Sequence, residues 1–204
     1  MKIKTLPLGE LETNCYIASC DGEAVVIDPG ADAELVLRMT ENEQSKIKYI
    51  ILTHAHFDHM GAAAELAEKS GAKLVCSVTD SLALDDPAVN LSGNFMPGLK
   101  TPKADIMVRE GDEICFGTAR LKVIETPGHT LGGICLYCEG TLFSGDTLFR
   151  RSVGRCDFPT GNGAALVNSV KEKLFVLPND TVVYPGHGLP TTIGEEKREN
   201  PYVR

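Results

Sequence analysis

The sequence has no long hydrophobic run and few basic residues for its length. No stretch approaches the roughly 18 apolar residues that a membrane-spanning helix requires, so we expect no membrane span. Twenty Lys and Arg residues stand against 28 Asp and Glu residues, which gives a formal net charge of −8. A general nucleic-acid binder needs a basic surface to displace counterions from phosphate, so this charge argues against that class. It does not exclude a small anionic substrate, because a bound dication can reverse the local potential.

The sequence also lacks a secretion signal and a disulfide framework. Residues 1–6 have no long apolar core and are typical of a first strand, so we expect a cytoplasmic protein. The seven cysteines are odd in number and scattered through strand-like segments, as is typical of buried thiols in a reducing compartment. Cys135 and Cys138 form a C-x-x-C pair. Because residues three apart in a strand point to opposite faces, two core thiols are favoured over a redox pair or a zinc knuckle.

The length and the order of the predicted elements indicate the fold class. The 204 residues, 43% apolar and 24% charged, suit one soluble domain spanning 1–204. Strands followed by a helix, a strand and a helix occur twice along the chain, which predicts two similar halves, each a sheet with helices on one side. If the two sheets pack face to face, the result is an α/β fold with four layers, an αββα sandwich, and the functional site lies at one edge. The expected strands are 2–8, 13–19, 23–28, 47–52, 73–76, 106–109, 113–116, 119–126, 133–138, 141–145 and 181–184.

Histidine is scarce, with five residues, and three of the five fall within Thr53–His59. This H-x-H-x-D-H segment follows an apolar run and precedes a small-residue helix that is expected to end at Gly71, so it occupies a strand-to-helix turn. His54 and His56, two apart in extended chain, project to the same side. Imidazole and carboxylate suit zinc, iron or manganese. The alternative is a set of structural histidines, each satisfied by a backbone hydrogen bond.

The remaining histidines also follow apolar runs and lie beside glycines. His129 follows Gly128, His187 follows Gly186, and Asp146 follows Gly145 in the same way. Five imidazoles and two carboxylates, Asp58 and Asp146, are enough to hold two divalent ions. Asp146 is the natural bridge between the ions, because a carboxylate has two oxygens; the alternative for Asp146 is a turn aspartate before Thr147.

Two further features have two interpretations each. Asp28, at the tip of a buried strand, is either a helix cap or the residue that orients a ligand histidine, and we favour the second role. Residues 85–104 form a long irregular segment in which Phe95 and Met96 are either part of a lid over a pocket or the anchors of a surface loop.

Four short motifs resemble, in order and spacing, those of the metallo-β-lactamase superfamily. They are His54-x-His56-x-Asp58-His59, Gly128-His129-Thr130, Gly145-Asp146-Thr147 and Gly186-His187-Gly188, and the match extends through Asp28-Pro29-Gly30 and residues 191–195. The segment 144–149, continuing to Ser152-Val153-Gly154-Arg155, looks like the short, single-domain glyoxalase II-like (hydroxyacylglutathione hydrolase-like) branch. The resemblance implies one metal on His54, His56 and His129, a second on Asp58, His59 and His187, and Asp146 bridging them.

The chain departs from the long glyoxalase II enzymes in one respect. Those enzymes carry a C-terminal helical domain whose basic residues help to hold glutathione, and we expect no such domain in this chain, which ends at Arg204. The thiol part of the substrate is therefore left open. Arg150, Arg151 and Arg155 are candidates for anion recognition near the site, with surface contacts as the alternative. Arg155 and Phe95 are the candidate substrate-binding residues.

The expected chemistry is metal-assisted hydrolysis of a small thioester, such as an S-2-hydroxyacyl-thiol. A water shared by two divalent ions, with zinc favoured over iron or manganese, loses a proton near neutral pH and attacks the carbonyl. Asp58 and His56 are the candidate catalytic residues, and Asp58 can also orient the nucleophile and carry its proton. The alternatives are a mononuclear iron persulfide dioxygenase, as the resemblance allows, or a lactone or ester hydrolase. We expect a small-molecule substrate, no nucleic-acid or membrane partner, and a monomer or a small homo-oligomer.

Overall fold

Six strands form the first sheet of the computed structural model, which describes residues 1–203. The sheet has the sequential order β1-β2-β3-β4-β5-β6, antiparallel from β1 to β3 and parallel from β3 to β6. Parallel neighbours need crossover connections, which helices supply here. The strands are β1 (Lys2–Leu8), β2 (Thr13–Cys20), β3 (Glu23–Ile27), β4 (Lys46–Ile51), β5 (Lys73–Ser77) and β6 (Ile106–Val108).

The second sheet also has six strands, in the order β14-β13-β10-β9-β8-β7. Its pairs are antiparallel except β10 with β13, which are parallel and are connected through helices. A separate two-stranded sheet pairs β11 with β12. The strands are β7 (Glu113–Phe116), β8 (Ala119–Glu125), β9 (Ile134–Cys138), β10 (Thr141–Gly145), β11 (Leu148–Phe149), β12 (Ser152–Val153), β13 (Val182–Pro185) and β14 (Thr191–Thr192).

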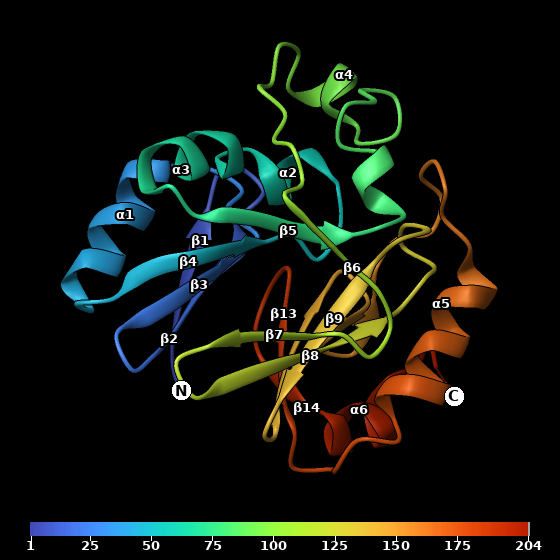
Figure 1. The fold of residues 1–204 in the computed structure, drawn as a ribbon. Helices are drawn as coiled ribbons and strands as arrows, with labels where there is room; N and C mark the ends of the chain where they lie inside the picture. Colours follow the sequence, from blue (N-terminus) through green and yellow to red (C-terminus); the bar gives the residue numbers. More distant parts are fainter. Residues whose placement is uncertain (204) are drawn as a thin grey trace.

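Helices cover the outer face of each sheet (Figure 1). On the first sheet they are α1 (Ala33–Asn42) and α3 (Ala63–Ser70), and on the second they are α5 (Gly163–Ser169), the π-helical turn η2 (Val170–Leu174) and α6 (Ile193–Glu199). Side chains cap three of them at the N-terminus: Asp32 accepts a hydrogen bond from the Leu35 amide, Asn162 from the Ala165 amide, and Thr192 from the Glu195 amide. Three shorter helices lie in loops: α2 (Phe57–Met60), η1 (Asp80–Leu82) and α4 (Ser92–Phe95).

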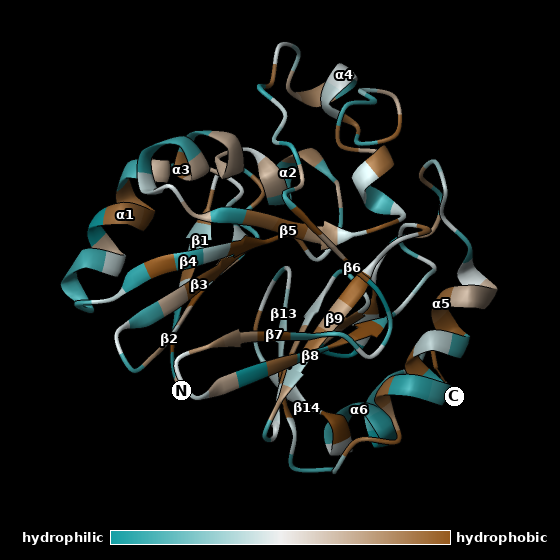
Figure 2. Ribbon diagram, viewed as in Figure 1, coloured by the Kyte–Doolittle hydropathy of each residue, from teal (hydrophilic) through white to brown (hydrophobic). Residues whose placement is uncertain are grey.

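Three hydrophobic clusters separate the four layers, which confirms the predicted αββα sandwich. Strand β3 shows how: Ala24 and Val26 pack toward the helices, while Val25 and Ile27 pack between the sheets. Figure 2 shows the hydrophobic colouring concentrated on the strands and on the inner sides of the helices, with hydrophilic residues outside. Cys135 lies in the outer cluster of the second sheet and Cys138 between the sheets, so the pair is two core thiols on opposite faces, as predicted.

The structure differs from the sequence prediction at a few elements. The helix expected to end at Gly71 is present as α3, whose C-cap is Gly71, and α2 is an additional short helix before it that was not predicted. The short helix expected near residues 79–84 is a single 3₁₀ turn. The strands β11, β12 and β14 and the helix α4 were not predicted, because elements of two to four residues carry no periodic signal. Cys115 and Cys156 are exposed, so the prediction that the cysteines are buried is wrong for these two.

Candidate metal centre

All five histidines and three aspartates meet where several strands end at the same edge of the two sheets. The turn between β4 and α2 carries the Thr53–His59 segment, and the loop between β8 and β9 carries His129. Asp146 directly follows β10, and His187 comes two residues after β13. Because β10 and β13 are parallel neighbours, their carboxyl ends lie side by side, and this brings Asp146 and His187 together.

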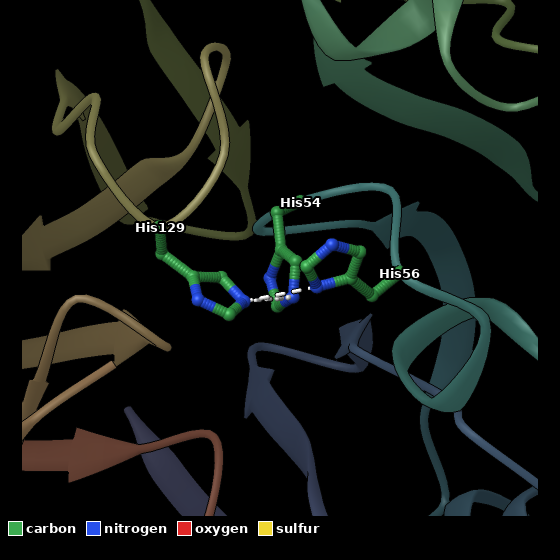
Figure 3. A group of neighbouring side chains, drawn as sticks. All are labelled: His54, His56 and His129. Carbon is green, nitrogen blue, oxygen red and sulfur yellow. Dashed lines mark hydrogen bonds between the residues drawn. The ribbon is translucent and has the colours of Figure 1, made fainter. Parts of the chain in front are cut away.

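Three histidines form the first group of converging side chains. His129 Nε2 lies 2.9 Å from His56 Nδ1 and 3.2 Å from His54 Nε2, so three ring nitrogens point at one another (Figure 3). All three side chains are buried, with 2–5% of their surface exposed. They come from two different loops, one on each sheet, and the arrangement leaves one nitrogen of each ring directed at a common point.

Asp58, His59 and His187 form the second group. Asp58 Oδ2 is 3.5 Å from His59 Nε2 and 3.3 Å from His187 Nε2. Asp146 lies between the two groups: its oxygens are 3.4 Å from His59 Nε2 and 3.5 Å from His129 Nε2. Within each group the potential ligand atoms lie within 4.8 Å of one another. The seven side chains predicted from sequence as ligands are therefore brought together, with Asp146 placed to contact both groups.

For three of the five rings, a hydrogen bond at Nδ1 determines that Nε2 faces the centre. His129 Nδ1 is 2.7 Å from the Arg155 carbonyl, and His187 Nδ1 is 3.1 Å from the Leu11 carbonyl. A carbonyl only accepts, so each Nδ1 carries the proton and each Nε2 presents a lone pair to the centre. His59 Nδ1 likewise donates a hydrogen bond to the Asp28 carboxylate, 3.0 Å from its Oδ2, so that Nε2 of His59 faces the centre. Metal-ligating histidines in proteins are oriented in this way.

The electrostatics of the two groups differ in sign. Burial lowers the pKa of His54 well below its ordinary value and that of His56 to about 3, so these imidazoles are neutral. Burial also opposes the charge on His59, but three surrounding carboxylates, led by Asp58, outweigh it and hold the pKa of His59 well above the ordinary value. In the same way the charge of His59 outweighs burial and lowers the pKa of Asp58 and of Asp146. Without a metal, protons therefore supply positive charge between these carboxylates.

Unpaired buried atoms identify what this set of residues fits. In the described part of the chain, four buried side-chain nitrogen or oxygen atoms have no hydrogen-bond partner, and two of them, His59 Nε2 and Asp146 Oδ1, lie in the centre 3.4 Å apart. A third, His56 Nε2, is not the ring nitrogen that faces His129. A buried polar atom without a partner is costly and is rare in proteins. Lone pairs from imidazole and carboxylate directed at one point suit a divalent cation such as zinc, iron or manganese. The donor set therefore fits a metal.

Asp28 contacts His59 on the side of the ring that faces away from the centre. Its carboxylate accepts hydrogen bonds from the Thr53 amide at 2.8 Å and the Thr53 hydroxyl at 2.7 Å, besides its contact with His59. The cap of helix α1 is supplied by Asp32 instead. Of the two interpretations of Asp28, the geometry therefore favours the one in which it orients a ligand histidine.

Three residues that support the centre were missed in the sequence. Thr13 donates a hydrogen bond from its hydroxyl to Asp58 Oδ2 at 3.0 Å, and the Asn14 amide group donates to the Pro185 and Gly188 carbonyls beside His187. Asp80 accepts hydrogen bonds from the amides of Ala55 and Gly132 and from the Thr130 hydroxyl, so it links the two loops that carry the three-histidine group. The only sequence signal was a polar residue at the end of an otherwise apolar segment.

Close backbone approach requires glycine at one position of the centre. A Cβ atom added to Gly186 would lie 2.1 Å from Asp146 Oδ1 and 2.8 Å from a ring carbon of His59. Any larger residue there would displace Asp146 or His59, so the glycine before His187 is required by packing.

The candidate substrate-binding residues lie around the centre rather than in it. The Arg155 guanidinium pairs with Asp157 and lies 4.1 Å above the Phe158 ring, whose centroid is 5.7 Å from that of His56. Arg150 and Arg151 are paired with Glu195. Phe95 is 63% exposed and stacks on Phe57, with 5.3 Å between ring centroids. Substrate binding by Arg155 or Phe95 stays a prediction.

Comparison with known protein sequences gives consistent matches over the whole chain. A family model described as the metallo-beta-lactamase superfamily matches residues 8–187. An uncharacterized protein of Aquifex aeolicus is 39% identical over an alignment that covers 100% of this chain and 97% of that protein. The hydroxyacylglutathione hydrolase GloC of Haemophilus influenzae is 33% identical, with coverage of 100% and 98%.

Solved structures give the same result. BLEG-1, described as a B3 metallo-beta-lactamase, has a TM-score of 0.93 and 38% identity, covering 99% of each chain. TTHA1623, crystallised in a di-iron-bound form, has a TM-score of 0.84 and 37% identity, covering 98% of this chain and 99% of its own. ETHE1 from Myxococcus xanthus has a TM-score of 0.83 and 34% identity, covering 98% and 84%. No helix among residues 1–203 is long and apolar enough to cross a membrane.

Proposed function

The chain belongs to the metallo-β-lactamase superfamily of metal-dependent hydrolases, and from this premise we propose that it hydrolyses small thioesters at a dinuclear centre. The observation that carries the proposal is the pair of ligand groups joined by Asp146. His54, His56 and His129 would hold one divalent ion, Asp58, His59 and His187 the other, and zinc is the favoured metal. The similarity to GloC supports an S-2-hydroxyacyl-thiol as the substrate type.

Asp58 and His56 would have different roles in the reaction. Two divalent ions bound here would supply a nucleophilic water at neutral pH and polarise the carbonyl of the thioester. Asp58 has one oxygen held by the Thr13 hydroxyl and stays ionised at neutral pH, because its pKa is lowered by His59. It can therefore orient that water and accept its proton. His56, buried and neutral, keeps its lone pair available as a ligand.

A second candidate function is oxidation of a persulfide at a single iron. The likeness to TTHA1623, which was crystallised in a di-iron-bound form, makes iron an alternative to zinc. Two histidines and one carboxylate form an iron site with open positions, and this ligand set contains such a combination. The likeness to BLEG-1 likewise adds a β-lactam to the esters and lactones that should be tested.

Metal content measured together with substrate turnover tests the proposal. We expect about two metal ions per chain and hydrolysis of S-2-hydroxyacyl-thiols without oxygen. One iron per chain with oxygen uptake on persulfides would replace the proposal by the second candidate. If the protein hydrolyses lactones, esters or β-lactams but not thioesters, it is still a hydrolase and only the proposed substrate class is wrong.

The variant His56→Ala tests the role of the three-histidine group. Loss of one ligand should lower kcat by at least about a hundredfold, because the nucleophile and the polarised carbonyl both depend on the centre. Circular dichroism should show an unchanged fold. Glu113→Gln is the control, because Glu113 is an exposed carboxylate on β7 that belongs to neither ligand group and pairs with Arg120 instead of a candidate substrate-binding residue. A His56→Ala protein with depleted metal and a near-normal rate would contradict the proposal.

A further inference from the structure

A second concave feature opens beside the metal centre. It is a cavity of about 220 Å³ that His56 lines together with Ala55, so it is continuous with the three-histidine group. Its other walls come from three segments: residues 79–89, which include η1, the loop that carries Thr130 and Leu131, and Thr160. None of these wall residues is a potential metal ligand in either group apart from His56.

Three polar side chains of this cavity, those of Asp80, Thr130 and Thr160, already form hydrogen bonds within the protein. The Asp80 carboxylate accepts hydrogen bonds from the Ala55 amide, the Gly132 amide and the Thr130 hydroxyl. The Thr160 hydroxyl accepts a hydrogen bond from the Leu131 amide. A bound molecule therefore gains little from hydrogen bonds to these groups. Apart from the Thr79 hydroxyl and the His56 ring, the surface that remains for contact is apolar.

Large apolar side chains border the cavity and are exposed to water. Leu82 is 81% exposed and Leu131 is 61% exposed, and both line the cavity. Val89 and Ala83 complete the apolar wall. Apolar side chains gathered in water beside a site are typical of a binding surface, because a ligand that covers them gains hydrophobic free energy.

We propose that this cavity binds an apolar substituent of the substrate, attached to the acyl carbon or to the sulfur of the thioester that is cleaved. The inference rests on the proposed function, because it places the scissile bond at the centre that His56 helps to form. A cavity of about 150 Å³ admits benzene. A cavity of about 220 Å³ therefore admits a chain or ring of about six to eight carbon atoms. An acetyl or lactoyl group leaves it unfilled.

Two series of thioesters, assayed with the metal-loaded protein, test this inference. In the first series the thiol is constant and the acyl group grows from acetyl to butanoyl, hexanoyl and octanoyl. In the second series the acetyl group is constant and the thiol grows from ethanethiol to hexanethiol. We expect kcat/KM to rise about three- to fourfold per methylene in one series and to level off near six to eight carbons. The series that rises identifies which side of the thioester enters the cavity. A flat profile in both series would overturn the inference.

A double variant, Leu82→Ala with Leu131→Ala, tests whether the dependence of kcat/KM on chain length arises from this cavity. Both side chains are exposed, so their truncation should cost little stability. In this variant kcat/KM should rise less than about twofold per methylene, because two apolar side chains that line the cavity are lost. The control is Leu189→Ala, an exposed leucine that does not line the cavity, and it should leave the dependence of kcat/KM on chain length unchanged. If Leu189→Ala flattened the profile and the double variant did not, the apolar group would bind elsewhere.

Binding of carboxylic acids separates failure of this inference from failure of the proposed function. Isothermal titration of the metal-loaded protein with acetate, butanoate, hexanoate and octanoate needs no turnover. The Kd should fall about three- to fourfold per methylene in the wild type and much less in the double variant. If no thioester is hydrolysed but this trend holds, the cavity is supported and the proposed function is wrong. If thioesters are hydrolysed but neither kcat/KM nor Kd depends on chain length, the cavity proposal is wrong and the proposed function stands.

Discussion

At the scale of single residues, Asp80 is the side chain that connects the two histidine-bearing loops. One of its oxygens accepts from the Ala55 amide, which lies between His54 and His56, and from the Thr130 hydroxyl, which follows His129. The other accepts from the Gly132 amide at 2.8 Å. Burial raises the pKa of Asp80, and these three donors partly offset that effect. The carboxylate therefore sets the distance between the loops without touching the common point of the three ring nitrogens.

The variant Asp80→Asn should weaken metal binding about ten- to a hundredfold, the range typical of residues that orient ligands. The amide NH₂ would face a backbone N–H and leave one buried donor unpaired, which costs about 1–3 kcal/mol of unfolding free energy. Competition with a metal chelator measures the affinity, and urea denaturation measures the stability.

Asp105→Asn provides the control for that change. Asp105 also accepts a hydrogen bond from a backbone amide, that of Leu74, but it lies next to β6, away from the centre. The variant Asp105→Asn should change metal affinity less than about twofold, because Asp105 does not position either of the loops that carry histidines. Equal affinities in the Asp80→Asn and wild-type proteins would show that Asp80 does not position the ligands.

At the scale of elements, residues 85–104 are tied to the start of α2, directly beside the metal centre. The Phe57 amide donates a hydrogen bond to the Asn90 carbonyl at 3.0 Å, and Phe95, at the end of α4, stacks on the Phe57 ring. In Figure 1, α4 extends away from the sheets above the β5 side of the fold. The segment therefore contacts the centre through Phe57, and of its residues Val89 lines the cavity.

Replacing Phe95 by alanine should loosen this segment while the sheets remain intact. The stacked pair contributes about 0.5–1.5 kcal/mol, so amide exchange in residues 85–99 and at Phe57 should become about two- to tenfold faster. Hydrogen exchange followed by mass spectrometry measures the effect. The variant Phe95→Tyr keeps the ring and should retain wild-type exchange. Unchanged exchange in Phe95→Ala would mean that the stack does not anchor the segment, and the lid interpretation would lose its support.

At the scale of the whole molecule, the metal centre joins the two sheets. His54, His56, Asp58 and His59 follow a strand of the first sheet, whereas His129, Asp146 and His187 follow strands of the second. A ligand that binds only the folded arrangement stabilises it by mass action. A metal held by residues of both sheets should therefore stabilise the whole sandwich and not only one loop.

Removal of metal should lower the melting temperature by about 5–10 °C. A ligand at about a hundred times its Kd contributes about 2.7 kcal/mol, and a chain of this size shifts by about 2–4 °C per kcal/mol. Calorimetry of the metal-loaded and the chelator-treated protein measures the difference, and addition of zinc should restore it. The His56→Ala variant should show a smaller shift. An unchanged melting temperature after verified metal loss would contradict a centre that bridges the sheets.

Several features of the fold and the centre could be predicted from the sequence because they depend on local patterns. The apolar run of β4 followed by the Thr53–His59 segment indicated a strand end with ligands, and glycines before His129, Asp146 and His187 marked similar turns. The continuous apolar run of β3 predicted a buried strand, and two packed sheets with outer helices bury both of its faces. These signals lie within a few residues of one another, so the sequence by itself determined the layers and the candidate ligands.

Only the tertiary structure decided which side chains support the ligands and where a substrate can lie. Asp80 meets Thr130 across 50 positions of the chain, and Asn14 meets Pro185 across 171. The cavity beside His56 has walls from four separate segments. Such contacts leave no periodic pattern, because they depend on how two sheets pack against each other and not on the residues that flank each position.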